Sequence, residues 1–132
     1  MVCIQCGAET RVANSRLQKR SNQVWRRRQC LICKTVFTTE EGVQLTSTWV
    51  VRGKSSRFQP FLREKLVLSL HRSLGHRSTA LTDAVGLSQT IIAKLHPHDG
   101  VIEAKQLVQI AFVALNRFDK LASRHYAAYH QL

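Results

Sequence analysis

Four cysteines near the start of the chain are the residues whose types and spacing point most directly to chemistry. They form two Cys-x-x-Cys pairs separated by 23 residues, and the last 99 residues contain no cysteine: Cys3, Cys6, Cys30 and Cys33. Each pair can offer two thiolates to one ion, and tetrahedral Zn²⁺ accepts four such ligands. The spacing therefore predicts one structural zinc ion held by all four cysteines.

Two disulfides or unpaired thiols are the alternatives to a metal. The sequence contains no apolar run of about 18 residues, and its start, MVCIQCGAET, has no signal-peptide core, so we expect neither membrane insertion nor secretion. A cytoplasmic location, at the nucleoid, follows as the expectation. Reducing conditions there would disfavour disulfides.

The segment that carries the cysteines is poor in large apolar side chains. Residues 1–46 place them in short bursts between Gly, Asn, Ser and Thr, a pattern typical of short strands and turns. So small a segment can bury little apolar area, and a metal would have to contribute to its folding. We interpret residues 1–46 as a zinc ribbon in which the long connection between the cysteine pairs forms a hairpin or arm.

Residues 47–132 show a different periodicity. Residues 48–58, TWVVRGKSSRF, predict two short strands around a Gly-Lys-Ser-Ser turn. Pro60 suits the first position of a helix, and leucines then recur every fourth position at Leu62, Leu66, Leu70 and Leu74.

Three further helices are predicted after this leucine repeat. They run from about residue 82 to 95, from about 103 to 118, and onward from Asp119, which can cap the last one. In that last helix Leu121, His125 and Tyr129 share a face, which we interpret as a core-facing stripe. The predicted fold class is α+β: a small N-terminal ribbon, then a β-hairpin and about four helices.

Charge indicates the kind of partner. The chain has 20 Lys and Arg against 8 Asp and Glu, a net charge of +12, which favours an anionic ligand such as nucleic acid. Eight of these cations, but only three acids, lie in residues 1–46, and seven of the eight lie between the cysteine pairs together with Trp25.

Arginines in this part of the chain can straddle phosphates or bond to guanine edges. On a strand, Arg26 and Arg28 would point to one face and Arg27 to the other. A solvated charged surface is the alternative to a nucleic-acid contact. The predicted DNA-binding residues are Arg11, Arg16, Arg26, Arg27, Arg28 and Lys34.

A second basic group lies in the later part of the chain. Arg52, Lys54 and Arg57 fall on the predicted hairpin and Lys65 falls early in the following helix, an arrangement that would suit a phosphate. The motif is not a P-loop, because Thr48 stands where its first glycine is required. From the residues alone, a plain basic hairpin and a nucleotide site both remain open.

Several of these motifs together resemble the NrdR-type transcriptional repressors, which regulate bacterial ribonucleotide reductase operons. The resemblance is carried by CIQC at residues 3–6, NSR at 14–16, VWRRRQCLIC at 24–33 and VFTTEE at 36–41. It continues through VVRGKSSRFQPFLREKL at 50–66, which is similar to the hairpin and first helix of an ATP-cone, and through FDKLASRHYAAY at 118–129.

The resemblance implies a zinc ribbon at 1–46 that binds paired sites in double-stranded operator DNA, and an ATP-cone at 47–132. The cone would bind ATP or dATP and change the state of a homo-oligomer accordingly. Matching positions imply these nucleotide-binding residues: Val50, Arg52, Lys54, Gln59, Lys65 and Tyr129. This chain departs from the family's pattern at Trp25, where an arginine is usual, at Ser55-Ser56 in the hairpin turn, and at Gln59, where an acid is usual.

The same residues bear on two other classes of function. A zinc-ribbon nucleic-acid-binding or interaction module without nucleotide response is the alternative to a repressor. An enzyme is not expected, because few residues are available for acid–base or metal catalysis. The chain has no cysteine outside the four-cysteine cluster and few acids, and its six histidines are scattered along the sequence.

Overall fold

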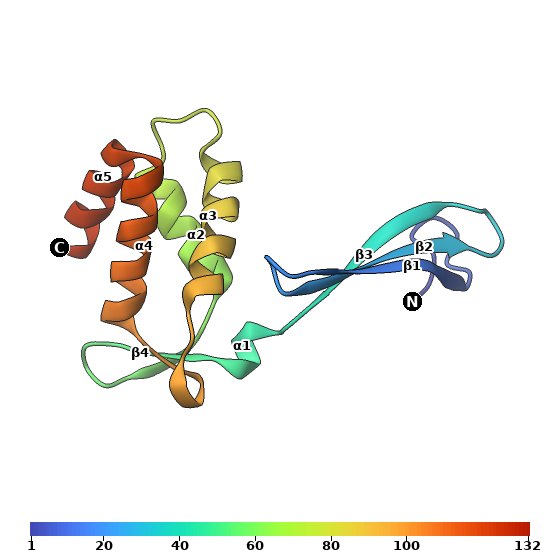
Figure 1. The fold of residues 1–132 in the computed structure, drawn as a ribbon, viewed down its shortest axis with the longest axis horizontal. Helices are drawn as coiled ribbons and strands as arrows, with labels where there is room; N and C mark the ends of the chain where they lie inside the picture. Colours follow the sequence, from blue (N-terminus) through green and yellow to red (C-terminus); the bar gives the residue numbers. More distant parts are fainter. The chain divides into compact units, whose positions relative to one another are not determined.

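The computed structural model describes all 132 residues, which form two compact units. We call Met1–Val43 the ribbon unit and Gln44–Leu132 the helical unit. The combination of a small N-terminal sheet with a later mixed unit confirms the predicted α+β class (Figure 1). None of the helices is long and apolar enough to cross a bilayer.

The ribbon unit is a three-stranded antiparallel sheet. Its strands are β1 (Thr10–Gln18), β2 (Gln23–Cys30) and β3 (Val36–Gly42), and β2 lies in the centre. The predicted hairpin is therefore β1–β2, closed at Lys19–Asn22, where Asn22 has a φ of 51° that asparagine tolerates better than most residues. A bulge between Val12 and Asn14 shifts the register of β1 by one residue.

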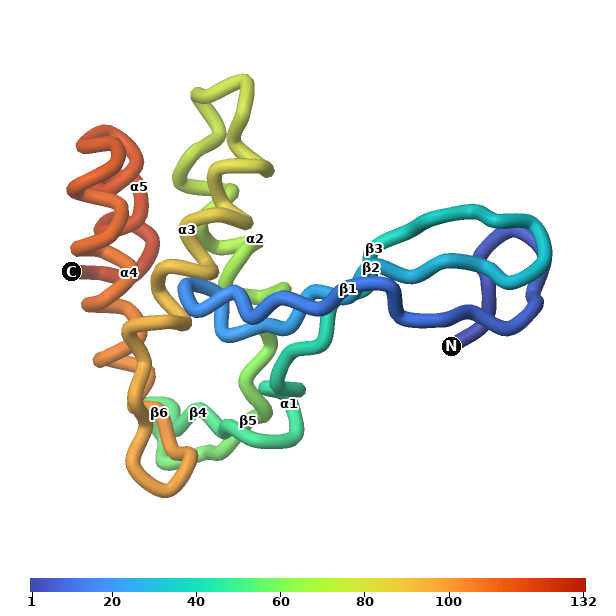
Figure 2. Tube along the Cα trace, turned by 45° about the vertical axis from the view of Figure 1, so that its right-hand side comes forward, coloured from blue at the N-terminus to red at the C-terminus, as the bar shows by residue number.

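The helical unit combines four long helices with a second small sheet. A short helix α1 (Leu45–Thr48) leads into β4 (Val50–Arg52) and β5 (Phe58–Pro60), and then come α2 (Arg63–Ser73) and α3 (Ala80–Lys94). A 3₁₀ turn η1 (His98–Gly100) precedes β6 (Val101–Glu103), α4 (Ala104–Phe118) and α5 (Lys120–His130). Figure 2 shows β4, β5 and β6 lying together at one end of the helices.

Strand β6 was not predicted from the sequence. It pairs with β4 in parallel, so the sheet order is β5-β4-β6, and the connection between the two strands passes through α2 and α3. Gly100 brings the chain into this strand with a φ of 73°, and a Cβ there would lie 2.8 Å from the carbonyl oxygen of Thr48. Both the backbone angle and the close approach therefore require glycine.

A hydrophobic core holds the helical unit together. The predicted leucine repeat of α2 is part of it, since Leu66, Leu70 and Leu74 are buried. The other helices, β6, and two residues that follow β5 and α3 contribute the remaining apolar core residues, which are Phe61, Ala80, Ala84, Leu87, Ile91, Leu95, Ile102, Ala111, Ala114, Leu115, Ala122 and Tyr126.

Three details of the sequence prediction were wrong. Pro60 ends β5, where it pairs with Val50, and α2 begins three residues later. The second long helix begins at Ala80, two residues before the predicted start. On α5 the face with Leu121, His125 and Tyr129 is exposed, and the smaller Ala122 and Ser123 face inward with Tyr126. Helical spacing identifies residues that share a face but does not say which face is buried.

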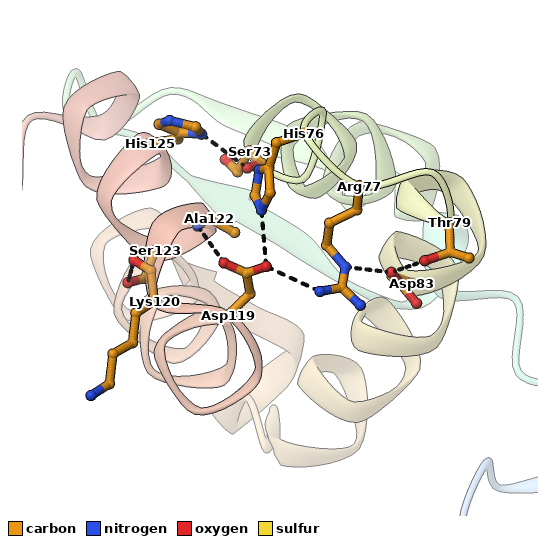
Figure 3. Close-up of polar contacts among 10 residues, drawn as sticks. All are labelled: Ser73, His76, Arg77, Thr79, Asp83, Asp119, Lys120, Ala122, Ser123 and His125. Carbon is orange, nitrogen blue, oxygen red and sulfur yellow. Dashed lines mark hydrogen bonds and ion pairs between the residues drawn. The ribbon is translucent and has the colours of Figure 1, made fainter.

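Asp119 caps α5, as predicted, and also links the start of α5 to the connection between α2 and α3 (Figure 3). Its Oδ1 accepts a bond from the backbone N–H of Ala122 at 2.9 Å. Its Oδ2 accepts from His76 at 2.9 Å and from Arg77 at 3.1 Å. The Ala122 N–H and the His76 and Arg77 side chains hold the pKa of Asp119 well below its ordinary value of 3.8.

Replacing Asp119 by Ala is expected to destabilise the helical unit by about 2 kcal/mol at pH 7, because a cap and two charge-assisted bonds are lost. The folded-state pKa is depressed, so the stabilisation is complete above the ordinary pKa of 3.8 and disappears as the pH falls below it. Urea unfolding followed by circular dichroism measures the difference. Glu64→Ala, at an exposed acid of α2, is the control, and an Asp119→Ala effect that stays equal at low pH would contradict the account.

Candidate metal centre and nucleic-acid interface

The four cysteine sulfurs lie together at one end of the ribbon unit. Their Sγ atoms are all within 4.8 Å of one another, with Cys3–Cys33 at 3.6 Å and Cys6–Cys30 at 3.5 Å. All four are free thiols, so the disulfide alternative is not realised. A tetrahedral zinc site with Zn–S bonds of about 2.3 Å has sulfur–sulfur edges of about 3.8 Å. The cluster therefore fits one Zn²⁺ with little rearrangement.

Both Cys-x-x-Cys turns have the same backbone construction. In each, the first cysteine donates its N–H to a carbonyl five residues later: Cys3 to Ala8 at 2.8 Å and Cys30 to Thr35 at 2.9 Å. The residue after each second cysteine is left-handed, with φ values of 72° at Gly7 and 64° at Lys34. The repeated pattern CxxC therefore specifies two similar knuckles that bring their sulfurs to one point.

Backbone N–H groups in these knuckles point at sulfur. The N–H of Gln5 lies 3.4 Å from the Sγ of Cys3, and those of Ile32 and Cys33 each lie 3.4 Å from the Sγ of Cys30. Burial by itself would raise the pKa of Cys30, but the two N–H groups outweigh it and lower the pKa below its usual value. Such donors stabilise the thiolate form that a metal requires.

Alternation along the strands separates the basic side chains onto two faces. The first face, which we call the open face, carries one set of cross-strand neighbours: Arg11 with Gln29, Asn14 with Arg27 and Thr38, and Arg16 with Trp25 and Glu40. The second, which we call the paired face, carries Val12 with Arg28 and Phe37, Ser15 with Arg26 and Thr39, and Leu17 with Val24 and Glu41.

The predicted DNA-binding arginines are consequently in different surroundings. On the paired face, Arg26 forms an ion pair with Glu41, and Arg28 donates to the hydroxyl of Thr39 at 3.3 Å. On the open face, Arg16 and Arg27 are exposed and form no side-chain hydrogen bond or ion pair, whereas Arg11 donates to Gln29 at 2.7 Å. Lys34 lies apart from both groups, on the second knuckle, and donates to the Leu31 carbonyl at 2.8 Å.

Five of the six predicted nucleotide-binding residues lie on the β4–β5 hairpin and the start of α2. Val50 and Arg52 are on β4 and Lys54 is exposed in the turn, while Lys65 donates to the side-chain oxygen of Gln59 at 3.3 Å. Arg52 forms an ion pair with Glu103 of β6. Sequence reasoning missed Glu103, because only the unpredicted parallel pairing of β4 with β6 brings it beside Arg52.

Tyr129, the sixth residue, lies in a different place. It is 66% exposed and lines an open cavity of about 410 Å³ between the end of α2 and α5. The other lining residues are Arg72, Gly75, His76, His125 and Ala128, none of which is on the hairpin. The six predicted residues therefore do not form one group.

Zinc-loaded protein is expected to carry one metal ion per chain, and Cys30→Ser is expected to lose it, because Cys30 is the buried member of the second knuckle. Elemental analysis of dialysed protein gives the ratio. Ser47→Ala, an exposed change in the helical unit, is the control. Retention of a full zinc equivalent by Cys30→Ser would contradict a four-thiolate site.

Comparison with known proteins supports the ribbon assignment. The family model described as "Transcriptional repressor NrdR-like, N-terminal domain" matches residues 1–41. This range contains all four cysteines and both faces of the sheet.

Full-length relatives extend the similarity to the helical unit. A protein named "Transcriptional repressor NrdR" from Syntrophotalea carbinolica is 32% identical over 133 residues, covering 99% of this chain and 84% of the relative. A protein of the same name from Afipia carboxidovorans is 33% identical over the same shares of the two chains. These relatives are named repressors, which confirms the prediction that the chain is not an enzyme. The chain belongs to the NrdR family of transcriptional repressors.

Proposed function

We propose that this protein is a zinc-dependent repressor of ribonucleotide reductase genes whose operator binding is controlled by ATP and dATP. Residues 1–46 bind double-stranded DNA, and residues 47–132 form an ATP-cone that binds adenine nucleotides and controls homo-oligomerisation. The observation that carries the proposal is a basic ribbon sheet, built on a four-cysteine cluster, in a chain that matches NrdR proteins along nearly its whole length.

Electrostatics support DNA as the ligand of the ribbon unit. On the open face, Arg11, Arg16 and Arg27 lie on two adjacent strands, and Glu40 is the acid in register with them. None of these three guanidinium groups is in an ion pair, so each can bind phosphate without first breaking one. The open face is thus the better duplex-binding surface, and Arg26 and Arg28 contribute less.

The β4–β5 hairpin supports nucleotide binding by the helical unit. Lys54 and Lys65 lie on the hairpin turn and at the start of α2, and neither is in an ion pair. Ammonium groups in these positions can bind the phosphates of ATP or dATP. Control of the oligomer then requires that ATP and dATP have different affinities for the different assemblies, since a ligand shifts an equilibrium only by its differential affinity.

One observation favours the alternative, a zinc-ribbon module without nucleotide response. Arg52 is already paired with Glu103, and Lys65 of α2 already contacts Gln59, so two of the proposed nucleotide-binding cations have partners within the chain. Nucleotide binding would have to replace these contacts. The two functions differ in a direct way, because only the repressor should change its mass distribution with nucleotide.

Arg27→Ala is expected to weaken binding to operator-type duplex DNA several-fold and to reduce the salt slope by about 1, because one phosphate contact is lost. Arg26→Ala, on the paired face of the same strand, is the matched control and should change the slope less. Fluorescence anisotropy at salt concentrations between about 0.05 and 0.2 M measures both. A flat salt response of the wild type would exclude phosphate contact, and a larger effect of Arg26→Ala would reverse the assignment of the faces.

Lys65→Ala is expected to weaken ATP and dATP binding about tenfold, because a charge-assisted bond to phosphate is lost. Titration calorimetry gives the affinities. Arg117→Ala is the control, since Arg117 lies near the end of α4 farther from β6. Native mass measurement without nucleotide, with ATP and with dATP tests the assembly. Unchanged affinity would remove Lys65 from the site, and identical masses in all three conditions would favour the module without nucleotide response.

A further inference from the structure

Trp25 is an exposed aromatic side chain at the centre of a basic sheet face. It lies on β2, the central strand of the ribbon sheet, and 41% of its surface is exposed. Its neighbours in register are Arg16 on β1 and Glu40 on β3. Its indole N–H has no partner in the chain, and no other exposed aromatic side chain occurs in the ribbon unit.

The other tryptophan shows what a packing role looks like in this protein. Trp49 is half-buried against the core of the helical unit. Its ring packs edge-on against that of Phe61, with 5.7 Å between the two ring centroids. Trp25 makes no aromatic contact and borders no buried apolar residue of a core, because the only buried residues of the ribbon unit are Cys3 and Cys30. Core packing therefore does not account for an indole at this position.

Two arginines and one acid, Glu40, lie beside the indole at spacings set by the sheet. Arg16 is on β1, whose backbone lies about 4.8 Å from that of β2, and Arg27 follows Trp25 two residues along β2, a backbone rise of about 6.8 Å. Both guanidinium groups lack partners within the chain. An aromatic ring flanked by free cations on an open sheet is the combination that binds single-stranded nucleic acid: bases stack on the ring and the cations hold the phosphates.

Stacking requires the flat face of a base. In a duplex these faces are covered by the neighbouring base pairs, whereas in a single strand they are free to stack on a side chain. We propose that the open face of the ribbon sheet also binds single-stranded nucleic acid, with Trp25 stacking on an unpaired base and Arg16 and Arg27 binding the adjacent phosphates. This activity is separate from nucleotide control and adds a second ligand to the surface proposed for duplex DNA.

The test compares a short single strand with its duplex on the zinc-loaded full chain. Labelled oligo(dT), oligo(U) and a duplex of the same length are titrated at equal salt, with fluorescence anisotropy as the readout. Trp25→Leu, which keeps an apolar side chain, should weaken binding to both single strands about tenfold, the typical effect of losing one stacked base. Binding to the duplex should change less than about threefold. Trp25→Phe should keep most of the single-strand affinity, because it keeps an aromatic face.

Tryptophan fluorescence provides a second readout. The chain has two tryptophans, so a Trp49→Phe variant leaves Trp25 as the only indole, and stacking should quench its emission more with oligo(dT) than with the duplex. Unchanged single-strand affinity in Trp25→Leu would overturn the proposal, and so would an equal loss for single strand and duplex, which would make Trp25 a duplex contact. If the protein bound the single strands but not the duplex, the result would count against the repressor function and would support the single-strand proposal.

Discussion

Attraction between four thiolates and one metal ion is the interaction on which the ribbon unit depends. Cys3 and Cys30 are its only buried residues, exposed by 3% and 1%. Its larger apolar side chains, such as Leu17, Ile32 and Val36, remain exposed and form no core. Three strands with so little buried area would not be stable alone. In the ribbon unit the metal supplies the folding free energy. In the helical unit a hydrophobic core supplies it.

A sheet held from one end does not need to bury either face, and this has a functional consequence. The sequence WRRR at residues 25–28 can place Arg26 and Arg28 on one face and Trp25 and Arg27 on the other without disturbing a core. Ion pairing on one face leaves the other with free cations and an exposed ring. The two faces therefore differ in how many of their arginines are free, and the positions of the acids decide this. Glu41 pairs with Arg26 on the paired face, whereas Glu40 on the open face lies beside Trp25.

Local patterns in the sequence predicted the parts of the fold that depend on local rules. The two CxxC turns predicted the metal cluster, the leucine repeat predicted α2, and Asp119 predicted the cap of α5. Pairings between distant segments were missed, because no local signal records them. Strand β6 pairs with β4 about fifty residues earlier, and this pairing alone places Glu103 against Arg52.

Residues on exposed elements were the hardest to assign. Alternation separated Arg26 from Arg27, but only the register with β3 identifies which of them has an acidic partner. Tyr129 follows the spacing of a core stripe and yet is exposed, because Ala122 and Ser123 allow the opposite face of α5 to approach its neighbours more closely. Spacing identifies a shared face, and packing against the rest of the chain decides its role.

Amide hydrogen exchange with and without zinc tests the central claim most directly. The claim is that the metal, and not apolar packing, folds the ribbon unit. It predicts that removing zinc abolishes protection of the β1–β3 amides and leaves the amides of α2–α5 protected, since the helical unit has its own core. Continued protection of β1–β3 in zinc-free protein would contradict it.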